Sequence, residues 1–119
     1  MILLEIPFAT PSLNTVQRQH WLTAWRSKKK WVKLVRDALI VSGNFPPPPP
    51  PPFAVVRIER FGPRQLDHDN MLGGAKSCID ALKDLRLIED DSPEHIQLHM
   101  VGLINKIPGT RVRITARVP

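Results

Sequence analysis

Apolar side chains recur every three or four residues between His20 and Val41, and basic side chains fill many of the positions between them. Such spacing places apolar side chains along one side of a helix. It predicts a helix that is clearest over residues 28–41, and Gly43 with Asn44 supplies residues that commonly follow a helix end. The apolar positions are Trp21, Leu22, Trp25, Trp31, Val32, Val35, Leu39 and Ile40.

A second helical pattern covers residues 71–85, and its apolar face is formed by Leu72, Ala75, Ile79 and Leu82. Four other stretches are apolar or alternate between apolar and polar residues, which is typical of strands. These are residues 2–6, 54–60, 96–104 and 111–118, with turn-forming residues at 11–15, 61–66 and 105–110. The resulting order predicts an α/β (α+β) fold, in which two helices pack on one small mixed sheet of about four strands.

The length of 119 residues suits one hydrophobic core, so we expect a single domain over residues 1–119. Inside it, the seven consecutive prolines Pro46–Pro52 have fixed φ angles and no amide donors. They predict a polyproline II rod of about 20 Å. This rod is either a spacer loop between a helix and a strand or a ligand for an aromatic-grooved partner.

Three features predict a protein of the reducing cytoplasm. A single cysteine, Cys78, excludes an intrachain disulfide framework. The opening run MILLEIPFA contains Glu5 and is too short for a secretory signal. No apolar run approaches the length of a membrane span, so a membrane partner is not expected.

Charge is unevenly distributed in a chain whose formal net charge is +6. Between Gln17 and Asp37 there are seven bases and one acid, whereas between Asp67 and Glu94 there are eight acids and three bases. A basic stripe of this size suits a polyanion such as a phosphate backbone, although it is also found on ordinary solvated helix faces.

Within the acidic region, Asp67 and Asp69 stand two residues apart in the sequence LDHDN. On extended backbone, such residues point to the same face. Two converging carboxylates form a hard-oxygen site for Mg²⁺ or Mn²⁺. The alternative is that Asp69 or Asn70 only caps the following helix and that Asp67 is a loop residue.

The longer stretch of residues 64–96 resembles the RusA family of Holliday-junction resolvases. The matching elements are Asp67-His68-Asp69-Asn70, Lys76, Asp80-Ala81-Leu82 and Asp90-Asp91. The resemblance implies a RusA-like fold and a small, homodimeric, Mg²⁺-dependent endodeoxyribonuclease, bacterial or phage-encoded, that cuts four-way DNA junctions in recombination and repair.

By the same resemblance, the metal ligands are Asp67, Asp69 and one of the Asp90/Asp91 pair, with Asp91 preferred. Lys76 corresponds to the catalytic lysine, and its alternative role is an i,i+4 surface pair with Asp80. Phosphodiester hydrolysis needs an activated water and neutralisation of charge on the phosphate, which carboxylate-held Mg²⁺ and a lysine can provide.

Two departures from the family pattern affect this assignment. Five residues separate Asn70 from Lys76, which is more than in the shortest family pattern. We expect a non-helical turn at Gly73-Gly74 to bring Lys76 close to the acids. No glycine precedes Asp90, although one is frequent there in the family. His68, His95 and His99 are expected to be solvated or packed, because no third soft ligand for zinc accompanies them.

The residues expected to contact the DNA backbone are Arg18, Arg26, Lys28, Lys29, Lys30, Lys33, Arg60 and Arg64. Three other functions remain open on the sequence. They are a related metal nuclease acting on forks or flaps, a DNA-binding module without catalysis, and an interaction protein that presents Pro46–Pro52.

Overall fold

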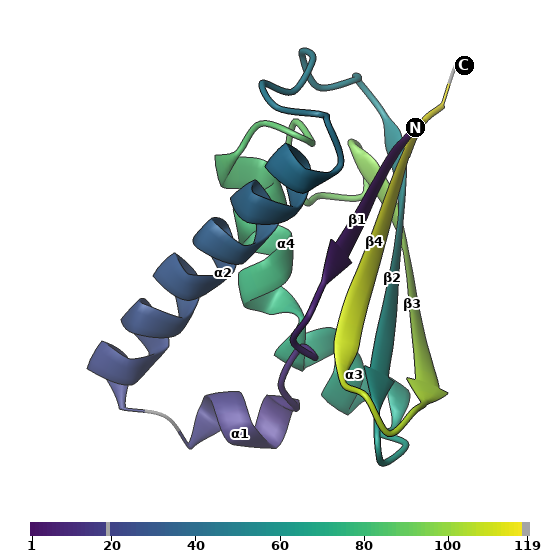
Figure 1. Cartoon of the computed structure of the whole chain (residues 1–119). Coiled ribbons are helices and arrows are strands. Elements are labelled where there is room, and N and C mark those ends of the chain that lie inside the picture. The colour runs from purple at the N-terminus through teal and green to yellow at the C-terminus, as the bar shows by residue number, and fades with distance from the viewer. Residues whose placement is uncertain (19, 118–119) are drawn as a thin grey trace.

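The computed structural model describes residues 1–18 and 20–117. Each of the first two strands of the described chain is followed by two helices, and two strands close it (Figure 1). In chain order the elements are β1 (Ile2–Ile6), α1 (Leu13–Gln17), α2 (Trp21–Val41), β2 (Ala54–Gly62), α3 (His68–Gly74), α4 (Lys76–Asp84), β3 (Ile96–Ile104) and β4 (Gly109–Ala116).

The strands of the described residues form one four-stranded sheet in the order β1-β4-β2-β3. The β1/β4 and β4/β2 pairs are antiparallel, whereas β2 and β3 run parallel. Parallel neighbours require a crossover connection, and α3 and α4 lie in that connection. The predicted small mixed sheet is therefore confirmed, and so is the α+β class.

The helices lie on one side of the sheet, and α2 and α4 pack against each other there (Figure 1). The buried core joins Trp31, Val35 and Leu39 of α2 to Leu82 of α4 and to the inner face of the sheet. A helix of 21 residues is about 31 Å long, whereas the nine residues of α4 span about 13 Å. Part of α2, including its first turn, therefore extends beyond α4 (Figure 1).

The helices of the described chain are more numerous than the two expected. Residues 13–17 form α1 rather than a turn, because the Ser12 hydroxyl accepts a hydrogen bond from the Thr15 amide at 3.2 Å and caps the helix. The predicted helix over residues 71–85 begins earlier and is divided at Ala75 into α3 and α4.

The expected non-helical turn at Gly73-Gly74 is wrong, since both residues belong to α3. These glycines serve close packing. A Cβ atom on Gly74 would lie only 1.6 Å from the carbonyl oxygen of Pro11, and one on Gly73 would lie 2.7 Å from Leu13 Cδ1. Their missing side chains let the segment leading into α1 rest directly on α3.

The strand boundaries match the predicted ones closely. The first and third strands have the expected bounds, and β2 continues through Phe61 and Gly62 because both residues pair with the end of β3. β4 begins two residues before the expected start, while Val118, the expected end, lies outside the described residues. The alternation of apolar and polar residues in β2 predicts that one face is exposed to solvent, yet Glu59 is buried, with Arg57 Nε 3.8 Å from its carboxylate.

Pro46–Pro52 lies in the connection between α2 and β2. Part of the run is packed against the body of the protein, where Pro48, Pro49 and Pro51 line a hollow together with Ile2 and Leu87. This position is that of a spacer segment. Among the described residues, none of the helices has the length and apolar character needed to cross a membrane.

Candidate functional site

The backbone becomes helical directly after Asp67, which is the N-cap of α3. Its Oδ1 accepts a hydrogen bond from the Asn70 amide at 2.9 Å, and its Oδ2 accepts one from the Asn70 side-chain amide at 3.1 Å. The expectation that Asp69 or Asn70 caps this helix is therefore wrong. Asp67 takes the role because it is the last residue with extended backbone, at φ −68° and ψ 163°.

Asp67 and Asp69 are both exposed and line one open pocket of about 350 Å³, together with Leu13, His68 and Asn70. The extended geometry expected for this pair is wrong, since Asp69 lies in the first helical turn. The two carboxylates nevertheless border the same pocket. The helix N-terminus adds positive partial charge there, which favours anionic groups.

Lys76 lies at the start of α4 and contacts two acids. Its Nζ donates a hydrogen bond to Asp91 Oδ2 at 2.9 Å and lies 3.4 Å from Asp80 Oδ1. The hydrogen bond to Asp91 raises the pKa of Lys76 and lowers the pKa of Asp91. Lys76 therefore stays an ammonium ion and Asp91 a carboxylate, so Lys76 can neutralise charge and donate hydrogen bonds but is a poor base.

The contacts of Lys76 belong to a larger cluster, which we call the α2–α4 charge network. Lys28 of α2 lies 3.7 Å from Asp80, and Lys83 lies 3.6 Å from Asp90 and 4.0 Å from Asp91. Acids and bases alternate through the cluster, so each carboxylate has a cation within reach. Its members are Lys28, Lys76, Asp80, Lys83, Asp90 and Asp91.

The turn that delivers Asp90 and Asp91 to this network contains no glycine. Arg86 instead adopts the left-handed conformation, with φ at 62°. Its amide donates to the Lys83 carbonyl at 3.0 Å, and the Leu87 amide donates to the Leu82 carbonyl at 2.9 Å. These two bonds form a Schellman ending for α4, in which position C′ is usually glycine. Arginine thus stands at a helix-ending position where glycine is usual.

The structure places the predicted site residues in two groups. Asp67 and Asp69 border the pocket at the start of α3, whereas Lys76, Asp90 and Asp91 belong to the α2–α4 charge network. Residues 1–18 and 20–117 contain no group of three His, Cys, Asp or Glu side chains placed to hold a metal ion together. Mg²⁺, however, is commonly held by one or two carboxylates with waters and substrate phosphate, and the Asp67/Asp69 pair fits this requirement.

The histidines and the cysteine have other surroundings. His68 borders the pocket with the two acids, His95 Nδ1 lies 3.3 Å from the Pro52 carbonyl oxygen, and His99 is exposed on β3. Burial raises the pKa of the Cys78 thiol to about 12, which leaves it inert as a nucleophile.

Most of the expected DNA contacts are exposed. The basic side chains of α2 point in different directions around the helix. Lys30 Nζ lies 4.6 Å from the Phe8 ring, whereas Lys29 Nζ lies 4.0 Å from the Trp25 ring. Arg60 is half-buried and donates to the Thr10 carbonyl at 2.7 Å. Burial, with a smaller effect of Arg64, lowers its pKa. The exposed members are Arg18, Arg26, Lys28, Lys29, Lys30, Lys33 and Arg64.

Two exposed aromatic residues were not singled out as functional by the sequence pattern. Trp21 and Trp25 share the apolar spacing of α2, so they were expected to face the core, but both are exposed near the N-terminal end of that helix. No protein-family model matches the chain, and no match is found among curated proteins. The functional conclusion therefore rests on the arrangement of these side chains and on the motif resemblance.

Proposed function

We propose that this protein is a Mg²⁺-dependent endodeoxyribonuclease that cuts branched DNA, in the manner of a Holliday-junction resolvase. The observation that supports this most strongly is the 2.9 Å hydrogen bond between Lys76 and Asp91. The motif resemblance selects these two residues separately, from positions 15 residues apart, and the fold brings them into contact.

In this proposal, Asp67 and Asp69 hold the metal ion at their pocket, and the motif resemblance supplies Asp91, or Asp90 as its alternative, as third ligand. Bound Mg²⁺ would polarise the phosphate and lower the pKa of a coordinated water. Lys76, held in its charged form, offsets negative charge that develops on the phosphate during attack. Mn²⁺ has the same preference for hard oxygen ligands and is expected to substitute.

The distribution of charge supports DNA as the substrate. The basic side chains of α2 are exposed, and Lys28 reaches from that helix to the α2–α4 charge network at Asp80. A phosphate backbone bound along α2 would therefore be led toward Lys76. Paired cuts in a four-way junction require two active sites, so the active form is proposed to be a symmetric homodimer.

Cleavage of a synthetic four-way junction, compared with plain duplex, fork and flap of matched sequence, tests this proposal. We expect paired nicks on opposite arms in Mg²⁺, none in EDTA, and none with Asp69→Asn. Cutting of forks or flaps without paired junction nicks would identify a related metal nuclease instead. Tight junction binding without cutting in Mg²⁺ or Mn²⁺ would refute the catalytic assignment and leave a DNA-binding module.

A further inference from the structure

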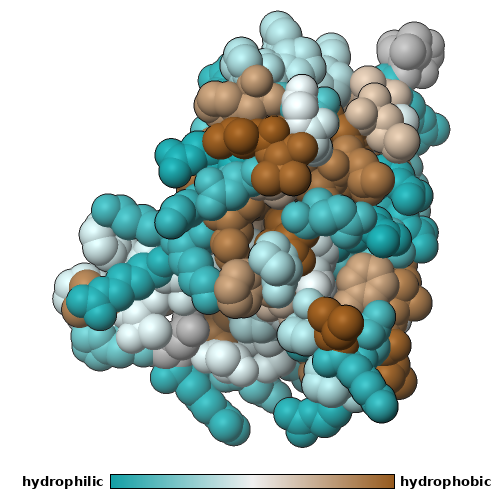
Figure 2. Space-filling model, viewed as in Figure 1, coloured by the Kyte–Doolittle hydropathy of each residue, from teal (hydrophilic) through white to brown (hydrophobic). Residues whose placement is uncertain are grey.

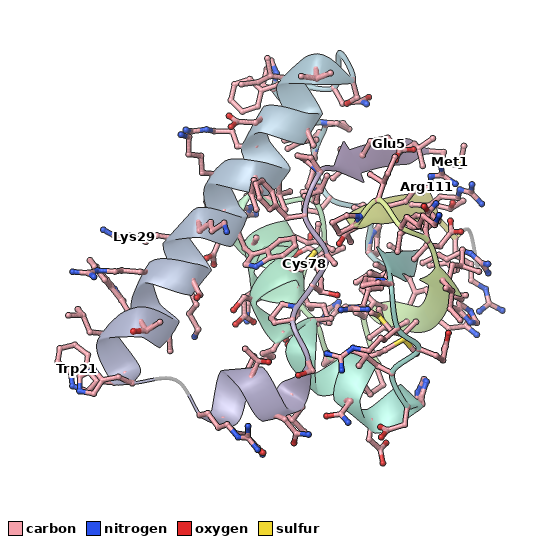
Figure 3. The ribbon with its side chains drawn as sticks, turned by 60° about the horizontal axis from the view of Figure 1, so that its bottom comes forward. Met1, Glu5, Trp21, Lys29, Cys78 and Arg111 are labelled. Carbon is pink, nitrogen blue, oxygen red and sulfur yellow. The ribbon has the colours of Figure 1, made fainter. Side chains whose placement is uncertain are left out.

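The first half of α2 exposes two large aromatic side chains. Trp21 is 72% exposed and Trp25 is 50% exposed, whereas Trp31, further along the same helix, is 5% exposed. Figure 3 shows Trp21 at the free end of α2 and Lys29 projecting outward from the same helix. In Figure 2, hydrophilic side chains dominate the lower left of the molecule, where α2 begins. The residues that follow Trp25 along α2 include the exposed bases Arg26, Lys28, Lys29 and Lys30.

Trp25 also forms one wall of a groove of about 480 Å³ beside α2. Among the residues that line the groove there are four bases and one acid. The lining residues are Trp25, Lys28, Lys29, Val32, Lys33, Arg36 and Asp84. A flat aromatic ring at the end of a row of bases suits a ligand that combines flat rings with phosphates.

We propose that this groove, which we call the Trp25 groove, binds a single-stranded segment of DNA and that Trp25 stacks on an unpaired base. Base–aromatic stacking beside a basic backbone track is the usual chemistry of single-strand binding. Lys29 Nζ, 4.0 Å from the Trp25 ring centroid, shows that the ring already attracts a cation. A stacked base would take the place of this ammonium group, which is then free to contact the adjacent phosphate.

The charge of the groove favours DNA over a second copy of the chain. Two copies meeting through this face would bring like-charged lysines together, and lysine is depleted in protein–protein interfaces. The groove also connects to the proposed catalytic region, because Lys28 lines it and lies 3.7 Å from Asp80, which in turn contacts Lys76. The choice of DNA as the ligand rests on the proposed function, and unpaired bases occur at the branch point of an opened junction.

Fluorescence anisotropy in EDTA tests the inference without cleavage. The probes are a fluorescein-labelled 20-nucleotide oligo-dT and a blunt 20-base-pair duplex. We expect Trp25→Ala to weaken oligo-dT binding about tenfold, with a change of less than about twofold for the duplex, and Trp25→Phe to keep most of the affinity. Phe45→Ala is the matched control, because Phe45 is also 50% exposed but lies beyond the other end of α2.

Several results would overturn this assignment. They are an unchanged oligo-dT affinity in Trp25→Ala, an equal loss for oligo-dT and duplex, and the same loss in Phe45→Ala. A change in sedimentation with unchanged DNA affinity would show a protein interface instead. If Trp25→Ala selectively loses oligo-dT affinity but the wild type never cuts DNA, this inference stands and the proposed nuclease function is refuted. If Trp25→Ala cuts and binds DNA normally, the nuclease function stands and this inference is refuted.

Discussion

Replacing Gly74 by alanine tests whether the segment before α1 rests on the backbone of α3. The new Cβ would lie 1.6 Å from the Pro11 carbonyl oxygen and 2.6 Å from its carbonyl carbon. An unstrained contact is about 3.5 Å, so the two backbones must separate by roughly 2 Å. The obstacle is main chain, which cannot rotate away as a side chain could.

The magnitude follows from two opposing effects. Overpacking a tight site costs about 1–3 kcal/mol, and a backbone obstacle points to the upper value. Alanine in place of glycine inside a helix stabilises by about 1 kcal/mol. We therefore expect Gly74→Ala to lower the free energy of unfolding by about 2 kcal/mol. In a domain of this size, the melting temperature would fall by about 6–10 °C.

Urea denaturation followed by circular dichroism measures this loss, and Gly73→Ala is the matched control. A Cβ on Gly73 meets only the Leu13 side chain, at 2.7 Å from Cδ1 and 3.0 Å from Cβ. The side chain can shift, so we expect Gly73→Ala to change stability by less than about 1 kcal/mol. If Gly74→Ala were as stable as Gly73→Ala, the proposed backbone contact would be wrong.

Three further predictions concern the site. Arg86→Gly should raise the free energy of unfolding, measured by urea denaturation, by up to about 1 kcal/mol, because glycine adopts a positive φ without strain. A clear loss of stability would contradict a strained Schellman ending. Asp67→Asn should keep the α3 cap and lose DNA cleavage, whereas Asp67→Ala should also lose about 1 kcal/mol of stability; equal stability of the two variants would show that the cap is unimportant. The stability difference between the wild type and Lys76→Met should be present at pH 7 and shrink below about pH 4, because Asp91 becomes protonated as the pH falls through its lowered pKa. A difference that does not change between pH 7 and pH 3 would show that the pair with Asp91 does not contribute.

The strands were the part of the fold that sequence reasoning predicted best. The alternation in β2 and the apolar run of β1 reflect which side chains are buried, and a few neighbouring residues are enough to show such a pattern. The division at Ala75 was missed because alanine is a good helix former and the break depends on how α3 and α4 pack. Gly73 and Gly74 were taken as helix breakers, since nothing local reveals that Leu13 approaches Gly73 and that Pro11 approaches Gly74.

The candidate site was predicted less completely. The motif selected Asp67, Lys76 and Asp91, but spacing alone could not show that Lys76 would pair with Asp91, because that contact depends on the turn after α4. This turn could not be predicted because Arg86 adopts the left-handed conformation, in which glycine is usual. Trp25 was expected in the core because helical spacing does not reveal where the partner helix ends.

The most direct test of the central claim is single-turnover cleavage of a four-way junction during a Mg²⁺ titration. The wild type is compared with Asp69→Asn and with Asp37→Asn, the same change at an exposed carboxylate on α2. We predict Mg²⁺-dependent cutting by the wild type and by Asp37→Asn, and none by Asp69→Asn although it binds the junction normally. Cutting by Asp69→Asn at the wild-type rate, or cutting that needs no divalent ion, would contradict the assignment of this site.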